Sequence, residues 1–198
     1  MTTLVNASDP RVKRTRQLLV QAFIALVEER HNLHSISVQE IAERATVNRA
    51  TFYAHFEDKY ALLQYWMREK FHRALASQLP VSSTLQLSTL RQLIVAVFDF
   101  LAIFRSYLKL ADQQYEPFFE IVLQQELSEV LLTWLKQDLL QVPERIEVIE
   151  TTAQVISWAI FGPAVQWSRG SQTISAEEMT HHVLRVVIAG LSPVTTVN

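Results

Sequence analysis

One short segment of the chain gathers side chains that donate hydrogen bonds and side chains that are small. Arg49 offers donors that fit either a guanine edge or a phosphate oxygen, and Ala50 and Thr51 beside it can touch a thymine methyl group. Tyr53 and His55 follow at the reach expected for phosphate oxygens. These residue types in this order predict a surface that contacts double-stranded DNA.

Two short helices and a tight turn are predicted to position this segment. Ser37 and Glu40 have the spacing of a capping box, which starts the first helix. Thr46 and Val47 form the turn, and Asn48 caps the second helix. A short second helix with one polar face suits the major groove, so the pair is predicted to be a helix-turn-helix. The alternative is an ordinary three-helix bundle whose polar face is simply solvated.

Lys59 extends the predicted contact surface past the second helix. Asp58 is a good N-cap for a longer helix that runs to about Gln78, and Lys59 lies in its first turn. Unpaired N–H groups at a helix start favour anions, so Lys59 is predicted to contact a phosphate oxygen there.

Helical periodicity continues through the rest of the chain and predicts an all-α fold. Only three glycines and six prolines occur, and most prolines lie at predicted helix starts. We expect about nine helices; the longer ones span roughly residues 10–29, 58–78, 85–104, 119–140, 144–168 and 176–190, with a short extra helix that ends near Ala111. The predicted domains are a three-helix helix-turn-helix domain over 1–57 and a larger helical domain over 58–198, and Pro80 to Thr84 is the clearest break in composition.

Charge differs between the two ends of the chain. Residues 1–73 carry 11 Lys and Arg against 8 Asp and Glu, whereas residues 74–198 carry 7 against 12. Only the basic front end suits a polyanion. Cysteine is absent, which excludes disulfides and thiolate metal sites and is compatible with the cytoplasmic location that we expect.

No segment predicts secretion or a membrane span. The N-terminus lacks a basic region followed by an apolar run. The most apolar stretch, Ile94 to Leu110, is short and contains Asp99, Arg105 and Lys109. A buried helix is therefore expected there, and no membrane partner.

The residues around the turn also follow a known pattern. Val38 and the pair Ile41-Ala42 precede a turn over residues 45–48, and the run Ala50-Thr51-Phe52-Tyr53-Ala54-His55-Phe56 leads to Lys59. In this pattern residues 11–65 resemble the TetR family of bacterial regulators. The resemblance covers less than a third of the chain.

The resemblance implies a homodimer that binds a palindromic DNA operator, usually to repress transcription. It places the DNA contacts on Ser37, Asn48, Arg49, Ala50, Thr51, Tyr53, His55, Lys59, Arg11, Lys13 and Arg14. Base contacts fall on residues 49–51. Phosphate contacts fall on the others, apart from the cap residue Asn48. Thr46 stands where the family has glycine, so the turn is expected to do without a residue that is free to take positive φ. Asn48 replaces a serine and keeps the cap chemistry.

The resemblance further implies a small-molecule effector inside the C-terminal domain. An apolar, aromatic-lined cavity would suit a hydrophobic or cationic aromatic ligand. The predicted lining residues lie on central helices: Phe98, Leu101, Tyr107, Phe119, Leu123 and Trp134. Asp99 and Gln124 are polar candidates to orient a ligand. Each of these residues also fits an ordinary core or surface position, which is the alternative.

The last two predicted helices are the family's dimer-forming pair. The residues expected to bury against a partner are Val155, Ala159, Gly162, Val165, Val183, Val186 and Val187. Pro163 lies within the first of these helices, where it removes one backbone hydrogen bond and predicts a kink near Gly162.

No catalytic centre, cofactor or metal site is predicted. The chain shows no Ser/His/Asp set, carboxylate pair or phosphate loop, so an enzyme is not expected. His181 and His182 are adjacent on a helix and point about 100° apart, so they would share a metal ion poorly. A regulator without an effector, controlled by a partner protein through the C-terminal domain, is the remaining alternative.

Overall fold

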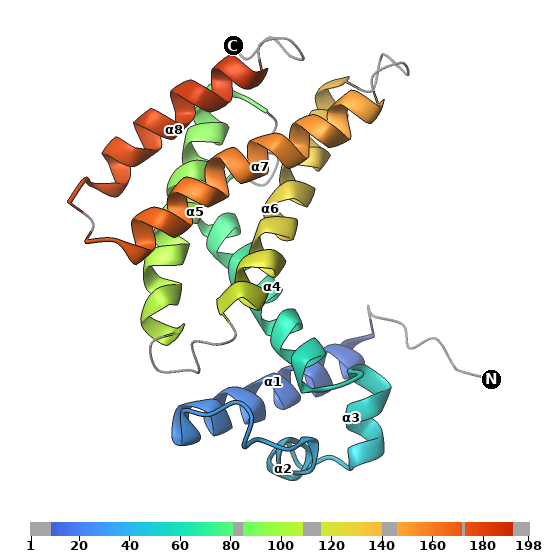
Figure 1. The fold of residues 1–198 in the computed structure, drawn as a ribbon. Coiled ribbons are helices and arrows are strands. Elements are labelled where there is room, and N and C mark those ends of the chain that lie inside the picture. The colour runs from blue at the N-terminus through green and yellow to red at the C-terminus, as the bar shows by residue number, and fades with distance from the viewer. Residues whose placement is uncertain (1–8, 81–84, 109–115, 140–145, 172, 192–198) are drawn as a thin grey trace. The chain divides into compact units, whose positions relative to one another are not determined.

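The computed structural model describes residues 9–80, 85–108, 116–139, 146–171 and 173–191. Within these ranges the chain forms eight α-helices and no strand, so the predicted all-α fold is confirmed (Figure 1). The helices are α1 (Pro10–Arg30), α2 (Val38–Arg44), α3 (Arg49–His55), α4 (Lys59–Gln78), α5 (Leu87–Leu108), α6 (Glu116–Leu139), α7 (Ile146–Arg169) and α8 (Ala176–Leu191).

The chain divides into two compact units. The N-terminal unit comprises Met1–Met67 with Leu108–Glu116, and the C-terminal unit comprises Arg68–Tyr107 with Pro117–Asn198. The division falls inside α4, which begins in one unit and ends in the other. The sequence places the domain boundary before that helix.

In the N-terminal unit α1, α2 and α3 pack on one another around a small core. Phe23 of α1, Ile41 of α2 and Phe52 of α3 are fully buried at its centre. Two ion pairs tie α1 to α2 outside this core. Arg30 pairs with Glu40, and Arg44 holds Glu29 through two hydrogen bonds of 2.5 and 2.7 Å.

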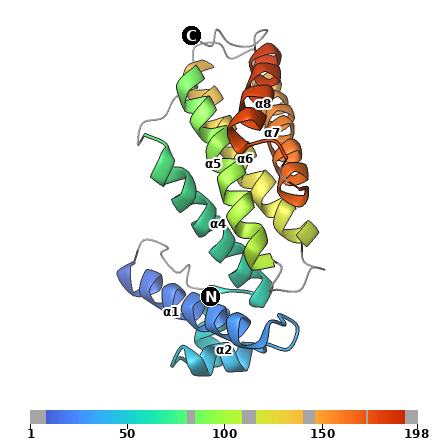
Figure 2. The same cartoon turned by 90° about the vertical axis from the view of Figure 1, so that its left-hand side faces the viewer.

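In the C-terminal unit α7 and α8 lie side by side and run antiparallel (Figure 1 and Figure 2). Ring contacts connect the other helices. Phe104 of α5 meets Phe119 of α6 with centroids 5.7 Å apart, and Phe98 meets Trp167 of α7 at 5.4 Å. Burial of large aromatic side chains at such contacts supplies most of the stabilisation of a helical core.

Glu126 of α6 binds the C-terminal half of α4. Its carboxylate oxygens lie 2.6 Å from Nε of Arg68 and 2.7 Å from Nε2 of His72, and only 13% of its side chain is exposed. Beside this cluster Phe71 of α4 packs edge-on against Phe100 of α5 at 5.1 Å. The second half of α4 is thus an integral part of the C-terminal unit.

Some predicted helix ends differ from the structure. The sequence pattern predicts a helix end near Phe104 and a separate short helix after it, but α5 continues unbroken to Leu108. Leu101 and Phe104 are both buried one turn apart, and no glycine or proline interrupts the helix there. Residues 109–111, Pro143 and the tail after Leu191 lie outside the described residues. The helix count is eight in the described chain, against about nine expected.

Two helical segments are long and apolar enough to span a membrane by length and composition alone. They are Leu87–Arg105 in α5 and Val148–Arg169 in α7. The share of these segments buried inside the protein is 50% and 44%, as is common for core helices of a helical bundle. α7 runs on through Pro163 as one helix, and the kink there stays a prediction.

Candidate nucleic-acid interface

Local side-chain contacts build the start of α2. The hydroxyl of Ser37 accepts from the Glu40 backbone N–H at 3.2 Å, and the Glu40 carboxylate accepts from the Ser37 N–H at 2.9 Å. The capping box is therefore present. The hydroxyl of Ser37 also donates to the same carboxylate at 2.8 Å. These bonds, together with Arg30, lower the pKa of Glu40 to about 2.

The turn between α2 and α3 places Thr46 in the left-handed region, at φ 56°. The turn therefore uses a positive φ although it lacks the glycine that would adopt it freely. The hydroxyl of Thr46 donates to the Ala45 carbonyl oxygen at 2.7 Å, while the Val47 N–H reaches the Ala42 carbonyl oxygen. A β-branched residue at positive φ is strained, and the packing of α2 against α3 must hold it there.

Asn48 organises the first turn of α3. Its side-chain oxygen accepts from the Thr51 backbone N–H at 2.7 Å and from the Thr51 hydroxyl at 2.9 Å. The hydroxyl of Thr51 is thus engaged within the helix, and its methyl group remains for outward contact. Ala50 between them is exposed. The N-terminal end of α3 therefore presents small apolar groups.

Arg49 and Tyr53 form a pair along the exposed side of α3. Nη2 of Arg49 donates to the Tyr53 hydroxyl at 3.0 Å, and the guanidinium carbon lies 5.4 Å from the centre of the Tyr53 ring. Both side chains are exposed. The Tyr53 ring stands edge-on to the buried Phe52 ring, with centroids 5.6 Å apart. The pair is therefore held against the core from one side.

Lys59 has a different setting from the predicted one. Its ammonium donates to the carbonyl oxygens of Leu33 at 2.9 Å, His34 at 3.1 Å and Ile36 at 2.8 Å. An ammonium has three hydrogens, so this arrangement uses all of them. The side chain thereby ties the start of α4 to the loop between α1 and α2, and a phosphate contact by Lys59 would compete with these bonds.

His55 lies beside a residue that the sequence analysis missed, Arg16 of α1. The guanidinium of Arg16 stacks 5.9 Å from the Phe56 ring and 5.5 Å from the Tyr65 ring. Burial, and then the charge of Arg16, lower the pKa of His55 and so favour its neutral imidazole. Among the described residues neither Nδ1 of His55 nor Nε of Arg16 has a hydrogen-bond partner, although both atoms are buried. No periodic or spacing signal marks Arg16, because its partners lie about 40 residues further along the chain.

The remaining basic residues of the N-terminal unit fall into two groups. Arg30 and Arg44 are neutralised by Glu40 and Glu29. The predicted contacts Arg11, Lys13 and Arg14 are exposed near the start of α1, and no carboxylate of the described chain lies within ion-pair distance of them. Positive charge that could meet a polyanion is therefore concentrated at the start of α1 and on α3.

In the C-terminal unit, the residues predicted to line an effector cavity are core residues where their side chains are described. Phe98, Leu101, Phe119, Leu123 and Trp134 are at most 6% exposed, and the side chain of Tyr107 lies outside the described part. Of the two polar candidates, Gln124 is buried and donates to the Ser157 hydroxyl at 2.9 Å, which joins α6 to α7. The carboxylate of Asp99 accepts from Gln78 at 3.4 Å.

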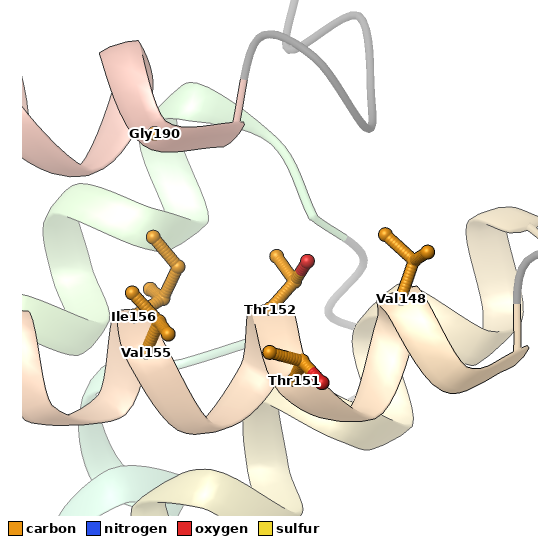
Figure 3. A pocket seen from close by; sticks show the side chains of 6 residues that line it. All are labelled: Val148, Thr151, Thr152, Val155, Ile156 and Gly190. Atoms are coloured by element: carbon orange, nitrogen blue, oxygen red, sulfur yellow. The ribbon is translucent and has the colours of Figure 1, made fainter.

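An open groove of about 430 Å³ lies elsewhere on this unit, between the N-terminal half of α7 and the end of α8 (Figure 3). Its lining is mostly apolar: Val148, Thr151, Thr152, Val155, Ile156 and Gly190. None of the predicted effector residues lines it. A Cβ atom on Gly190 would approach Ile156 to 3.4 Å, so the glycine allows the end of α8 to lie close to α7.

The predicted dimer residues also separate into two sets. Val165, Val183 and Val187 are buried inside their own protomer, which leaves little of them for a partner. Val155 and Val186, by contrast, are 59% and 67% exposed. Trp158, 51% exposed, lies on the same stripe of α7 and was not included in the predicted set. Ala159 is half-buried, and a Cβ atom on Gly162 would meet no atom within 4 Å.

The geometry of α2, the turn and the capped, outward-facing α3 defines the N-terminal unit as a helix-turn-helix domain. The model of the bacterial regulatory proteins of the tetR family matches residues 27–65, which include these elements. The match covers the helix-turn-helix part of the chain.

Comparisons that reach beyond the domain agree with this assignment. YxbF of Bacillus subtilis (strain 168), an uncharacterized HTH-type transcriptional regulator, is 27% identical over 181 residues, which cover 75% of this chain and 47% of that protein. The chain thus spans about half the length of this curated relative.

Solved structures share the fold. The TetR transcriptional regulator from Streptococcus agalactiae superposes with a TM-score of 0.55 at 21% identity, covering 91% of this chain and 97% of the other. Thermus thermophilus FadR, a TetR-family transcriptional repressor solved in complex with lauroyl-CoA, gives 0.51 at 20% identity, covering 89% and 94%.

Proposed function

We propose that this protein is a cytoplasmic transcriptional regulator that binds a palindromic DNA operator as a homodimer, represses transcription, and is released by a small apolar effector. The observation that carries the proposal is α3. It is a short helix, capped by Asn48 and anchored by the buried Phe52, that turns Arg49, Ala50 and Tyr53 outward. A helix with this exposure and chemistry suits a major groove.

Charge supports the DNA part of the proposal. The exposed Arg11, Lys13 and Arg14 of α1 lie in the same unit as Arg49. Duplex DNA carries a dense row of phosphates, and cationic side chains without carboxylate partners gain affinity by releasing its counterions. The acidic C-terminal unit offers no such attraction.

The exposed stripe of α7 and α8 supports the homodimer. Val148, Val155 and Trp158 recur on α7 at helical spacing, and Val186 is exposed on α8. Clustered exposed apolar side chains on a soluble protein mark interaction surfaces, and tryptophan is enriched among residues that dominate binding. Gly162 permits close approach of a partner helix. A two-fold dimer would present two copies of α3, as a palindrome requires.

The effector part of the proposal rests on the aromatic composition of the C-terminal unit and on its shared fold with FadR. That protein was solved with lauroyl-CoA, so acyl-CoA is the first ligand class to test here. The burial of Phe98, Leu123 and their neighbours favours the second candidate, a regulator that takes its signal from a partner protein. Effector entry would require these side chains to move apart.

The test has three measurements on the full chain. Selection of bound duplexes from random DNA should give a two-fold symmetric site whose half-site centres lie about one helical turn, roughly 34–36 Å, apart. Sedimentation should show a dimer. Lauroyl-CoA should weaken binding of the protein to the selected DNA site. The DNA site should weaken binding of lauroyl-CoA to the protein by the same factor. Indifference to every duplex at low salt would refute the proposal, and binding that no acyl-CoA alters would favour the second candidate.

A further inference from the structure

We propose that Arg49 and Tyr53 together clamp one DNA phosphate, and that α3 reads bases through the methyl groups of Ala50 and Thr51. This division of roles rests on the proposed function, since it concerns how α3 meets a duplex. In this division Arg49 contacts the DNA backbone, although its chemistry equally suits a guanine edge.

The first step is the direction of the Arg49 side chain. The hydroxyl that it contacts belongs to Tyr53, one turn further toward the C-terminal end of α3. The guanidinium therefore lies along the helix, against the Tyr53 ring at 5.4 Å. A recognition helix touches bases mainly with its N-terminal residues, and this guanidinium is drawn away from that end.

The second step is the hydrogen-bond inventory of the pair. The Tyr53 hydroxyl accepts from Arg49 and keeps one hydrogen to donate. The guanidinium has five N–H groups, of which this bond uses one. The pair thus presents only donors to an incoming group, next to a positive charge. An anionic oxygen acceptor fits that inventory, and the DNA phosphate is the anion that lines a groove.

The third step compares the two possible partners. A phosphate can bind while the hydrogen bond and the ring contact between Arg49 and Tyr53 both persist. A bidentate guanine contact would require Arg49 to extend past the start of the helix and to give up both. The Tyr53 ring, for its part, packs edge-on against the fully buried Phe52, and this contact would be lost if Tyr53 moved with Arg49. The phosphate is therefore the partner that the existing geometry favours.

The fourth step concerns what remains for base reading. The Thr51 hydroxyl donates its hydrogen to the Asn48 side chain, so the methyl group is the part of this partly exposed side chain that is left for a base. Ala50 is exposed and offers a second methyl. In the major groove the apolar feature that such groups recognise is the C5-methyl of thymine. The half-site read by α3 should therefore contain thymine opposite these residues.

The experiment measures binding of wild type and variants to duplexes selected from random DNA, over a series of salt concentrations. Arg49→Ala should weaken every duplex by the same factor, about tenfold for each protomer. It should also lower the slope of log affinity against log salt by about one for each protomer, with unchanged base preferences. Arg73→Ala is the matched control, because it removes an exposed arginine from the C-terminal unit, and it should change neither quantity.

A double-variant cycle tests the coupling. If one phosphate is shared, Tyr53→Phe and Arg49→Ala together should lose less affinity than the product of their separate losses. Replacement of the half-site thymines by deoxyuridine, one at a time, should cost about threefold to fivefold at one position or more.

Three results would overturn the inference while leaving DNA binding intact. They are a changed base preference in Arg49→Ala, independent losses in the cycle, or no loss for any deoxyuridine duplex. Failure of the wild type to bind any duplex would instead refute the proposed function and this inference with it.

Discussion

The two units of this protein hold their helices in place by different means. In the N-terminal unit, polar groups do much of the positioning. Some are close in sequence, as in the box of Ser37 and Glu40 and the cap of Asn48, while Lys59 reaches three carbonyl oxygens of the loop between α1 and α2. In the C-terminal unit, ring contacts and buried apolar side chains join helices distant in sequence, as Phe98 meets Trp167. The first arrangement fixes an exposed surface with few residues, while the second builds a large core.

Loss of one buried ring should unfold the smaller unit more readily than the larger one. Phe52→Ala removes a fully buried ring and should cost about 3–5 kcal/mol, which a small core tolerates poorly. Hydrogen exchange should show the amides of α1 to α3 losing protection while those of α5 to α8 keep theirs. Phe161→Ala, at an equally buried ring of the larger unit, is the matched control. Joint loss of protection in both units would show that the two do not differ as described.

The exposed stripe of the larger unit should respond to an added charge more than another exposed apolar site of that unit does. Trp158→Glu places a carboxylate on the proposed dimer surface and should weaken self-association at least about 100-fold, without loss of helix content. Ile121→Glu on α6, a site of similar exposure, should leave association unchanged. Sedimentation over a dilution series measures both. Equal effects of the two variants would place the interface elsewhere.

Thr46 offers a way to stabilise the smaller unit. Thr46→Gly removes the strain of a β-branched residue at φ 56° and should raise the free energy of unfolding by about 1 kcal/mol, after allowance for the freedom of glycine in the unfolded chain. Thr46→Ala keeps a Cβ atom at positive φ and should gain less. Urea unfolding of the wild type and the two variants measures their free energies of unfolding and so ranks the three. A less stable glycine variant would mean that the Thr46 hydroxyl outweighs the strain.

Glu40 should make the smaller unit sensitive to acid. Its folded-state pKa of about 2 lies below the ordinary value of 4.5, so the unfolded chain binds more protons between these values. The stability that it contributes is complete above pH 4.5 and is lost as the pH falls toward 2. Glu40→Gln keeps the capping box and removes this titration. Thermal melts from pH 6 to 2.5 should therefore fall less steeply for the variant than for the wild type, and parallel curves would contradict the assignment.

The sequence predicts the helix caps of the N-terminal unit well because each cap joins residues only a few positions apart. The caps at Ser37, Asn48 and Asp58 and the limits of α2 and α3 follow from short-range rules. Short-range rules do not predict the ring contacts of Arg16 or the hydrogen bonds of Lys59 to the loop carbonyl oxygens. Both sets of contacts join residues more than 20 positions apart. Spacing along one helix cannot show such partners.

The C-terminal unit shows the same limit on a larger scale. Periodicity places Val183 and Val187 on an apolar face, but it cannot say whether α7 of the same chain or a partner covers that face. The structure shows that the same protomer does, while Val155, Trp158 and Val186 stay exposed. The end of α5 was missed for a related reason, since burial of Leu101 and Phe104 carries the helix on to Leu108.

The solvent-exposed indole of Trp158 should make the fluorescence emission of the chain depend on whether another surface covers it. Trp134 is almost enclosed, so its emission should vary little with protein concentration. Half of the Trp158 surface faces water in the isolated chain, so its emission should shift to the blue when another surface covers it. The fluorescence of a dilution series can therefore test the proposed self-association without any added dye.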